Sequence, residues 1–327
     1  MLRFLVFADL HYKKGMYAST VEHLEAILAR AKQAGAEFVI HLGDLCNDYA
    51  GSPELTEAYL HNRYGLPVFG IYGNHELETR GNTTENVTPL LCNADVSFGK
   101  DGAGYWHHDI KGFRLIGLDT NYSYNSALSL WQHNAPASWG APDGNLCADS
   151  LGPEQLKWLD ETLADAKAKG LKALVFSHAG LSGEWESSPD SEAVREIFSK
   201  YENTVLMSLN GHLHTDRFCV KDGVAYFDVN TVLNGYWKVS DAHHYSDDHT
   251  FVRGIPGTGD TETVRLDSLS QGKNTWFFED PLSAIVEIGD DNSIRITGSR
   301  TEWKYRIAPA DPEEGITPEI TNRKKII

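Results

Sequence analysis

Five short apolar segments, separated by longer stretches with helical periodicity, constrain the fold of this chain more than any other feature of its sequence. They are rich in β-branched and aromatic residues, as strands buried on both faces of a sheet are. These segments cover residues 2–8, 38–42, 68–72, 171–176 and 205–209. Because strands that alternate with helices build layered folds with buried sheets, the sequence predicts an α/β architecture.

The stretches between these segments carry helix signals. A capping-box pattern at residues 19–22 opens an amphipathic stretch that ends at Gly35. Proline in the first turn predicts two further helices, over residues 52–65 and 152–170, and we expect a fourth over residues 191–201.

Two long segments interrupt this alternation. Residues 121–150 are rich in Asn, Ser, Pro and aromatic residues, and residues 234–272 are rich in Gly, Asp, Ser and His. Loops of this length inside a compact domain are usually functional or disordered. We therefore expect a catalytic core with one insertion, a second insertion that could form a lid, a β-rich C-terminal segment packed on the core, and an extended tail. Their boundaries are 1–233 with the insertion 121–150, then 234–272, 273–307 and 308–327.

The charge and cysteine content narrow the partners and the compartment. The formal net charge of −17 over 327 residues argues against bulk nucleic acid and an anionic membrane surface as partners. A small phosphorylated substrate is still compatible, because bound cations reverse the potential locally. The four cysteines have no paired spacing, no apolar run approaches the roughly 20 residues of a membrane span, and the apolar start is too short for a signal peptide. We expect a cytoplasmic protein, and the sequence leaves its oligomeric state open.

Polar residues follow each of the five apolar segments directly. They are Asp9-Leu10-His11, Gly43-Asp44, Gly73-Asn74-His75-Glu76, Ser177-His178 and Gly211-His212-Leu213-His214. Ligands of open α/β sheets collect outside the carboxyl ends of the strands, so we expect these side chains at one rim. Any one of these histidines could serve packing alone, but packing gives no reason for polar residues at all five ends. Imidazole, carboxylate and amide groups without a thiolate suit Mn²⁺, Fe or Zn²⁺.

This ordered set resembles the signature of the calcineurin-like metallophosphoesterases, which reads D-x-H, G-D, G-N-H-[ED], H and G-H-x-H. The five blocks span residues 9–214, about two thirds of the chain. Segment 151–159 and the Gly-His-Leu-His block are similar to the phosphodiesterase-like, cyclic-nucleotide branch of that family. The resemblance implies a two-sheet β-sandwich flanked by helices in four α/β/β/α layers, with long loop insertions and a β-rich C-terminal part. It also implies a cofactor of two divalent transition-metal ions, Mn, Fe or Zn.

The resemblance further implies a role for each residue of the signature. One metal would be held by Asp9, His11 and His214, the second by Asn74, His178 and His212, with Asp44 bridging both. His75 would stand beside the phosphate as the catalytic residue, either donating a proton to the leaving oxygen or stabilising charge. Two cations roughly 3.5–4 Å apart share a hydroxide and aim it in line at phosphorus. An alternative for His75 is that it only positions Asn74.

We expect hydrolysis of a small-molecule phosphodiester. A phosphomonoesterase or a nuclease on the same fold is the first alternative, and a metal-free interaction scaffold is an alternative of another class. The substrate-binding residues we expect are Asn47, Tyr122, Trp131 and Trp139. The three aromatic side chains could stack on a base, or they could pack a lid against the core.

Overall fold

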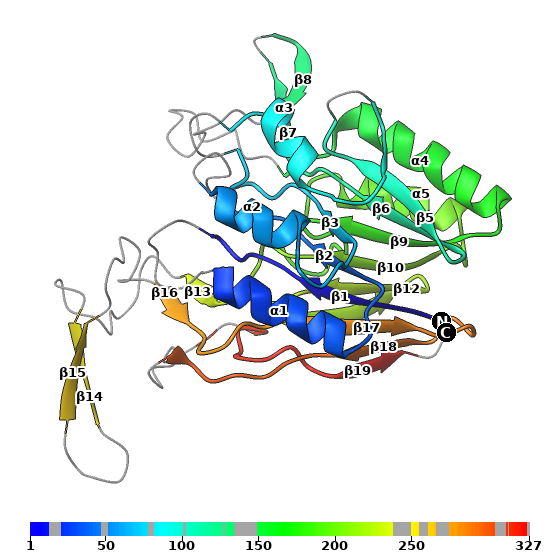
Figure 1. Cartoon of the computed structure of the whole chain (residues 1–327). Coiled ribbons are helices and arrows are strands. Elements are labelled where there is room, and N and C mark those ends of the chain that lie inside the picture. Colours follow the sequence, from blue (N-terminus) through cyan, green and yellow to red (C-terminus); the bar gives the residue numbers. More distant parts are fainter. Residues whose placement is uncertain are drawn as a thin grey trace.

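Two mixed β-sheets lie face to face, and helices cover both outer faces (Figure 1). The structure is a computed structural model that describes residues 1–12, 21–46, 52–77, 82–100, 103–126, 128–133, 149–237, 250–254, 261–265, 275–304, 312 and 314–325. This arrangement confirms the predicted α/β sandwich.

The first sheet combines strands from both ends of the chain. Its strands are β1 (Leu2–Phe7), β2 (Phe38–His41), β3 (Val68–Gly70), β17 (Ala284–Ile288), β18 (Ile294–Thr297) and β19 (Arg323–Lys325). Their order is β19-β18-β17-β1-β2-β3. The strands β1, β2 and β3 run parallel, as predicted, and β17 pairs antiparallel with β1.

The second sheet contains the other two predicted strands, β9 (Lys172–Ser177) and β10 (Val205–Asn210). Its remaining strands are β4 (Ser97–Phe98), β5 (Trp106–Ile110), β6 (Phe113–Gly117), β11 (Arg217–Lys221) and β12 (Val224–Asp228). The order is β11-β12-β10-β9-β6-β5-β4, with β6, β9, β10 and β12 parallel. The buried Arg114 in β6 is paired with Asp109 and Asp165, so a charged residue lies inside a strand that the apolar pattern did not indicate.

The helices α1 (Val21–Gln33) and α2 (Pro53–Leu60) cover the first sheet, and α4 (Gly152–Ala168) and α5 (Ser191–Lys200) cover the second. Two short helices, α3 (Thr84–Val87) and η1 (Thr88–Leu90), follow β3. The helix predicted over residues 52–65 is too long, because Asn62 ends it. The Asn62 amide hydrogen-bonds the backbone of Tyr59 and of Leu66 and closes a turn there.

The main core lies between the two sheets. The ring of Phe4 in β1 meets the ring of Phe176 in β9 edge to face, with centroids 6.1 Å apart. Successive residues of β9 point to opposite faces: Leu174 belongs to the core between the sheets, and Val175 to the second core under α4 and α5. This alternation explains why these strands read as continuous apolar runs.

The insertions contain strands of their own. Segment 121–150 holds the hairpin of β7 (Tyr122–Asn125) and β8 (Leu130–His133). The second insertion contributes β13 (Asn234–Trp237), which pairs with β16 (Thr275–Phe277), and a separate hairpin of β14 (Thr250–Gly254) and β15 (Thr261–Arg265). Whether either insertion forms a lid stays a prediction. Among the described residues, no helix is long and apolar enough to cross a bilayer.

The C-terminal residues form part of the first sheet. The segment 273–307 does more than pack on the core, since β17 lies beside β1 in the interior of that sheet. At the end of this β-rich segment, Trp303 makes a single bridge, to Phe278. The tail predicted for residues 308–327 is wrong for Arg323–Lys325, which forms the edge strand β19.

A buried ion pair ties this edge strand to the loop that carries His214. The Asp216 carboxylate accepts hydrogen bonds from both terminal nitrogens of Arg323, at 2.7 and 2.8 Å. It also accepts hydrogen bonds from the backbone and the hydroxyl of Thr321. Asp216 is almost fully buried, so Arg323 supplies the countercharge that its carboxylate needs.

We predict that Arg323→Ala lowers the free energy of unfolding by about 3 kcal/mol, because it leaves a buried carboxylate unpaired. Arg300→Ala is the control, since Arg300 is 82% exposed and its ion pair with Glu319 is 3.7 Å long. The free energy of unfolding of Arg300→Ala should fall by less than about 1 kcal/mol. Urea unfolding of the two variants measures both values, and equal losses would contradict the proposed anchoring.

Candidate metal centre

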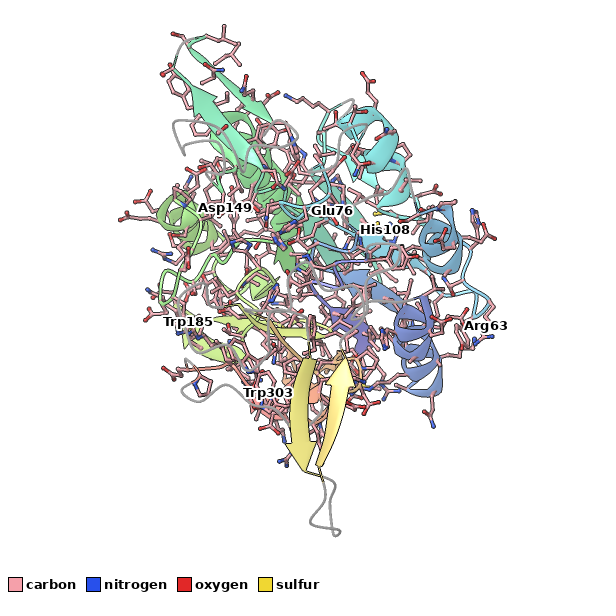
Figure 2. All side chains as sticks on the ribbon, turned by 90° about the vertical axis from the view of Figure 1, so that its left-hand side faces the viewer. Arg63, Glu76, His108, Asp149, Trp185 and Trp303 are labelled. Atoms are coloured by element: carbon pink, nitrogen blue, oxygen red, sulfur yellow. The ribbon has the colours of Figure 1, made fainter. Side chains whose placement is uncertain are left out.

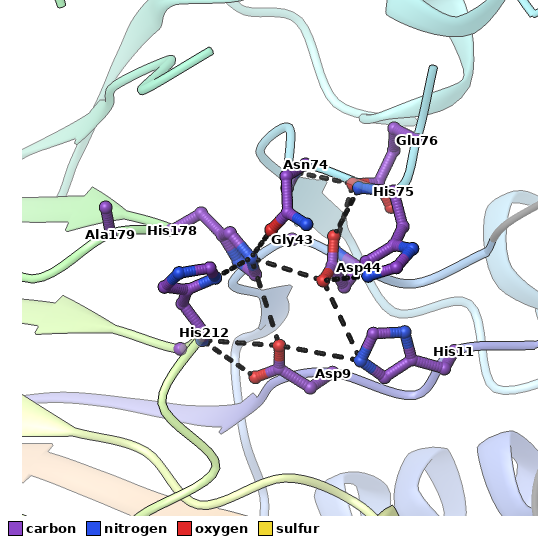
Figure 3. Close-up of polar contacts among 12 residues, drawn as sticks. Asp9, His11, Gly43, Asp44, Asn74, His75, Glu76, His178, Ala179 and His212 are labelled. Atoms are coloured by element: carbon purple, nitrogen blue, oxygen red, sulfur yellow. Dashed lines mark hydrogen bonds and ion pairs between the residues drawn. The ribbon is translucent and has the colours of Figure 1, made fainter. Parts of the chain in front are cut away.

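The carboxyl ends of β1, β2, β3, β9 and β10 meet at one rim, and the structure brings all eight signature positions together there (Figure 3). Three overlapping groups of carboxylate and imidazole side chains have ligand atoms within 4.8 Å of one another. Asp9, His11, Asp44, His75 and His178 in these groups are buried.

The backbone at this rim adopts left-handed conformations. Five of the signature residues have positive φ angles, namely Asp9 (57°), His11 (51°), Asp44 (52°), His212 (71°) and His214 (55°). Residues other than glycine rarely adopt this region, and such conformations concentrate at functional sites. Backbone hydrogen bonds between neighbouring loops hold two of them, from His11 N to Asp44 O at 2.8 Å and from Asp9 N to Gly43 O at 3.2 Å.

Two glycines allow the loops to approach the candidate ligands. A Cβ atom on Gly73 would lie 2.1 Å from Asp44 Oδ1, and one on Gly43 would lie 2.5 Å from His178 Nδ1. Gly43 also has a φ of +90°. The glycines beside the candidate ligands therefore allow the close approach, and Gly43 also allows the left-handed turn.

The first candidate site is formed by Asp9, His11 and His214. The Nε2 atoms of His11 and His214 face each other at 3.2 Å. Asp9 Oδ1 lies 3.5 Å from His214 Nε2 and 3.9 Å from His11 Nε2. Asp9 also accepts two hydrogen bonds from the backbone N–H of His212, which orient its carboxylate.

The second candidate site is formed by Asn74, His178 and His212. His178 Nε2 lies 3.0 Å from Asn74 Oδ1 and 3.2 Å from His212 Nδ1. Asp44 stands between the two sites, because its Oδ2 atom lies 3.3 Å from His178 Nε2 and 3.7 Å from His11 Nε2.

These distances suit metal coordination. Ligand atoms about 2.0–2.2 Å from one cation stand roughly 3–4 Å apart, and the pairs within each candidate site are 3.0–3.9 Å apart. The mixture of imidazole, carboxylate and amide groups fits Mn²⁺, Fe or Zn²⁺. His178 donates its Nδ1 hydrogen to the Leu42 carbonyl at 2.7 Å, which leaves Nε2 as the atom directed at the cation.

Electrostatics favour cations at this rim. Burial opposes ionisation of Asp44, but His178, His75 and His11 surround it and hold the pKa of its carboxyl well below the usual value. Burial also opposes ionisation of Asp9, and His214 is the main cause of its lowered pKa. Burial lowers the pKa of His11 to about 3, so its ring is neutral at pH 7. Burial opposes protonation of His178, but Asp44 and Asp9 raise its pKa to about 10, so the two buried carboxylates attract positive charge strongly.

Glu76 holds the loop that carries Asp44 through hydrogen bonds to the backbone. Its Oε2 atom accepts hydrogen bonds from the backbone of Asp44 at 2.9 Å and of Gly73 at 2.5 Å. Its Oε1 atom accepts hydrogen bonds from Leu45 and Cys46. Burial and the neighbouring Asp44 raise the pKa of Glu76 to about 7. This residue therefore orients the candidate ligands.

His75 lies at the edge of the first candidate site. Its backbone N–H donates to Asp44 Oδ1 at 2.9 Å, and its Nε2 atom lies 3.9 Å from Asp44 Oδ2. Its ring meets the ring of His11 edge to face, with centroids 4.8 Å apart. Geometry alone would allow His75 to join His11 and Asp44 as a ligand. Its assignment as a non-ligand rests on the family pattern.

The structure describes two of the four expected substrate residues. Tyr122 and Trp131 line one cavity beside the start of α4. Asn47 and Trp139 lie outside the described residues.

Sequence reasoning missed Asp149, whose Oδ2 atom lies 3.7 Å from His212 Nε2. Because Nδ1 of His212 faces the second candidate site, Asp149 approaches the opposite side of the same ring. No motif marks this residue, since only the fold brings it beside His212.

We predict that Asp149→Ala weakens one of two metal sites about 10- to 100-fold, as loss of a carboxylate partner of a ligand histidine does. Calorimetric titration with Mn²⁺ should then resolve one unchanged and one weakened site. Glu186→Ala is the control, because Glu186 is an exposed carboxylate near Asp149 that contacts no candidate ligand in the described part of the chain. Equal weakening of both sites would contradict a role through His212.

Known proteins share this sequence pattern and fold. A sphingomyelinase phosphodiesterase C from Dictyostelium discoideum is 25% identical over 186 residues, which are 52% of this chain and 37% of that protein. A manganese-dependent ADP-ribose/CDP-alcohol diphosphatase from Arabidopsis thaliana is 24% identical over 252 residues, which are 66% of this chain and 78% of that protein. The chain thus spans little more than a third of the first relative and most of the second.

A solved dimetal phosphatase from Danio rerio has the same fold, with a TM-score of 0.57 and 15% identity, over 91% of this chain and 95% of that one. The sequence model of one family, described as calcineurin-like phosphoesterase, matches residues 2–216. With that match over most of the chain, and with the signature residues gathered at one rim, the chain belongs to the calcineurin-like phosphoesterase family.

Proposed function

We propose that this protein hydrolyses small phosphodiesters with the help of two divalent transition-metal ions, Mn, Fe or Zn. The position of Asp44 carries the proposal, because one of its oxygen atoms lies 3.3 Å from His178 Nε2 and 3.7 Å from His11 Nε2. A carboxylate placed between two groups of ligands is suited to bridge two cations.

The proposed ligands follow the two candidate sites. Asp9, His11 and His214 would hold one cation, and Asn74, His178 and His212 the other, with Asp44 shared. When bound, such a pair activates the attacking water and neutralises charge on the phosphoryl oxygens. His75 would act on the leaving oxygen as a proton donor, from its place beside Asp44.

The charges of the proposed ligands suit an anionic substrate. Two divalent cations bring four positive charges, and the carboxylates of Asp9 and Asp44 bring two negative charges. The other proposed ligands are neutral when they bind a cation, so two positive charges remain. This local surplus attracts a phosphate ester even though the whole chain has a net charge of −17.

Several observations favour a small phosphodiester. The relatives from Dictyostelium and Arabidopsis are named as a phosphodiesterase and a diphosphatase, and both names describe attack on a phosphorus with two ester or anhydride links. The acidic balance of the chain disfavours long polyanions. A phosphomonoester substrate and a nuclease activity are the alternatives within the fold. The free thiols of Cys92 and Cys219 support a reducing compartment such as the cytoplasm.

A metal-free interaction scaffold is the alternative of another class. All eight signature positions are kept in this chain, whereas a scaffold has no need of them. Elemental analysis decides between the two, because a scaffold would hold no stoichiometric metal after reconstitution.

We predict different defects for Asp44→Asn and His75→Ala. Asp44→Asn removes the shared negative charge, so metal content should fall from about two equivalents and activity should fall with it. His75→Ala should keep its metal and lose about 10²- to 10⁴-fold in kcat, as loss of a general acid does. Elemental analysis and steady-state kinetics measure both.

The leaving group tests the role of His75 further. If His75 donates a proton, its loss should matter less for a nitrophenyl leaving group, which needs no proton, than for an alkoxide. An equal defect for both would instead assign His75 to positioning. Loss of metal in His75→Ala would make it a ligand.

We also predict that small diesters are cleaved at least about tenfold faster than single-stranded DNA, because the net charge of −17 repels long polyanions, whose binding needs several basic contacts. Parallel assays at matched phosphate concentration measure the ratio. The Asp44→Asn protein controls for a contaminating nuclease. Comparable DNA cleavage that this variant lacks would make the protein a nuclease.

A further inference from the structure

A cavity of about 290 Å³ lies beside the metal centre, between the β7–β8 hairpin and the start of α4. Its lining is mostly aromatic and apolar, with one ion pair, Lys100–Glu154, at its edge. It is lined by Lys100, Tyr105, Tyr122, Trp131 and the residues 151–155. We call this cavity the aromatic pocket.

The hairpin presents two aromatic rings to the pocket. In its register Tyr122 pairs with His133, and Tyr124 pairs with Trp131. Because alternate residues of a strand share one face, Tyr122 and Trp131 lie on the same face of the hairpin. The opposite wall accommodates Trp131 closely, since a Cβ atom on Gly152 would lie 3.2 Å from that ring.

Contacts of His133 hold the pocket wall that carries Tyr122 in place. The buried Asp119 carboxylate lies 2.9 Å from His133 Nε2. The ring of His133 contacts Tyr122 on one side and Tyr72 on the other, with centroids 5.2 and 5.3 Å apart. These contacts fix the base of the hairpin, so the pocket wall is preformed rather than assembled by a ligand.

The same short segment borders the pocket and the metal centre. Tyr122 N donates to Ser150 O at 3.0 Å, and the preceding residue, Asp149, reaches His212 Nε2 at 3.7 Å. The following residues, Leu151 and Gly152, line the pocket. In the view of Figure 2, Asp149 lies beneath the projecting hairpin. Residues 149–152 therefore connect the candidate metal centre to the pocket along the chain.

We propose that the aromatic pocket binds a planar ring, of the size of a nucleobase, carried by one arm of the phosphodiester substrate. The proposal rests on the proposed function for the reaction, but binding of the ring itself needs no metal. Three rings line the cavity, and stacking on them favours a flat π-system over an alkyl chain. The cavity is at the small end of ligand pockets, so it suits one ring system.

The edge of the pocket adds polar groups to this stacking surface. The Lys100–Glu154 ion pair and the hydroxyl groups of Tyr105 and Tyr122 offer donors and acceptors to a heterocycle. A ring with nitrogen and oxygen atoms at its edge matches this lining better than a plain hydrocarbon does.

Calorimetric titration with adenosine and with cytidine tests the pocket, because neither probe carries a phosphate. Trp131→Ala should raise the Kd of the tighter probe about 5- to 150-fold, the loss expected for one stacking contact. Tyr122→Leu, which keeps apolar volume in this partly buried position, should also raise it. Leu130→Ala is the control, since Leu130 adjoins Trp131 in β8, is 43% exposed and points to the other face. It should leave the Kd unchanged.

Kinetics with the metal-loaded protein provide the second measurement. Trp131→Ala should raise the KM for ADP-ribose, which carries a ring, and leave the KM for glycerophosphocholine, which has none. No binding of either nucleoside to the wild-type protein at millimolar concentration would overturn the proposal. Equal effects of Trp131→Ala and Leu130→Ala, or equal KM changes for both substrates, would also overturn it. Nucleoside binding that depends on Trp131, together with no hydrolysis of any diester, would support the pocket and reject the proposed function.

Discussion

The arrangement of the rim depends on the buried carboxylate of Asp44. A negative charge with 2% of its surface exposed is tolerated only when opposite charge or hydrogen-bond donors surround it. Here His178 and His11 approach one oxygen, and the backbone of His75 donates to the other. Glu76 holds the loop of Asp44 by accepting from its backbone. A fixed carboxylate between two groups of candidate ligands suits the proposed pair of cations.

Holding this site costs backbone strain, and the sandwich supplies the stability that offsets it. Five signature residues have left-handed backbone, each at a cost of about 1 kcal/mol or more. The strands that carry them are buried on both faces, so the strain is imposed by a rigid frame. The C-terminal strands complete this frame, because β17 pairs with β1 from Leu2 to Val6, and Arg323 fixes the loop after His214 through Asp216.

The predictable parts of the fold were those that local sequence encodes. Runs such as residues 2–8 are apolar because both faces are buried, and each polar block follows its own strand, so strands and candidate ligands could be predicted together. The apolar pattern did not indicate strands β5 and β6, because Arg114 interrupts it. Asp165, which pairs with Arg114, lies 51 residues away in sequence. The place of β17 beside β1, and of Asp149 beside His212, likewise depends on contacts between distant segments that no local pattern records.

In our proposal the rim carries out the reaction, and the insertion at residues 121–150 helps to select the substrate. The signature side chains come from strand ends inside the sandwich, and most of them are buried, so they have little surface left with which to recognise the rest of a substrate. The side chains of His212 and Asp149 are each 25% exposed, and they mark the side on which the centre opens. On that side the chain continues directly into the wall of the aromatic pocket. Two of the three rings that line the aromatic pocket, Tyr122 and Trp131, belong to the insertion at residues 121–150, so our proposal gives this insertion a part in substrate selection.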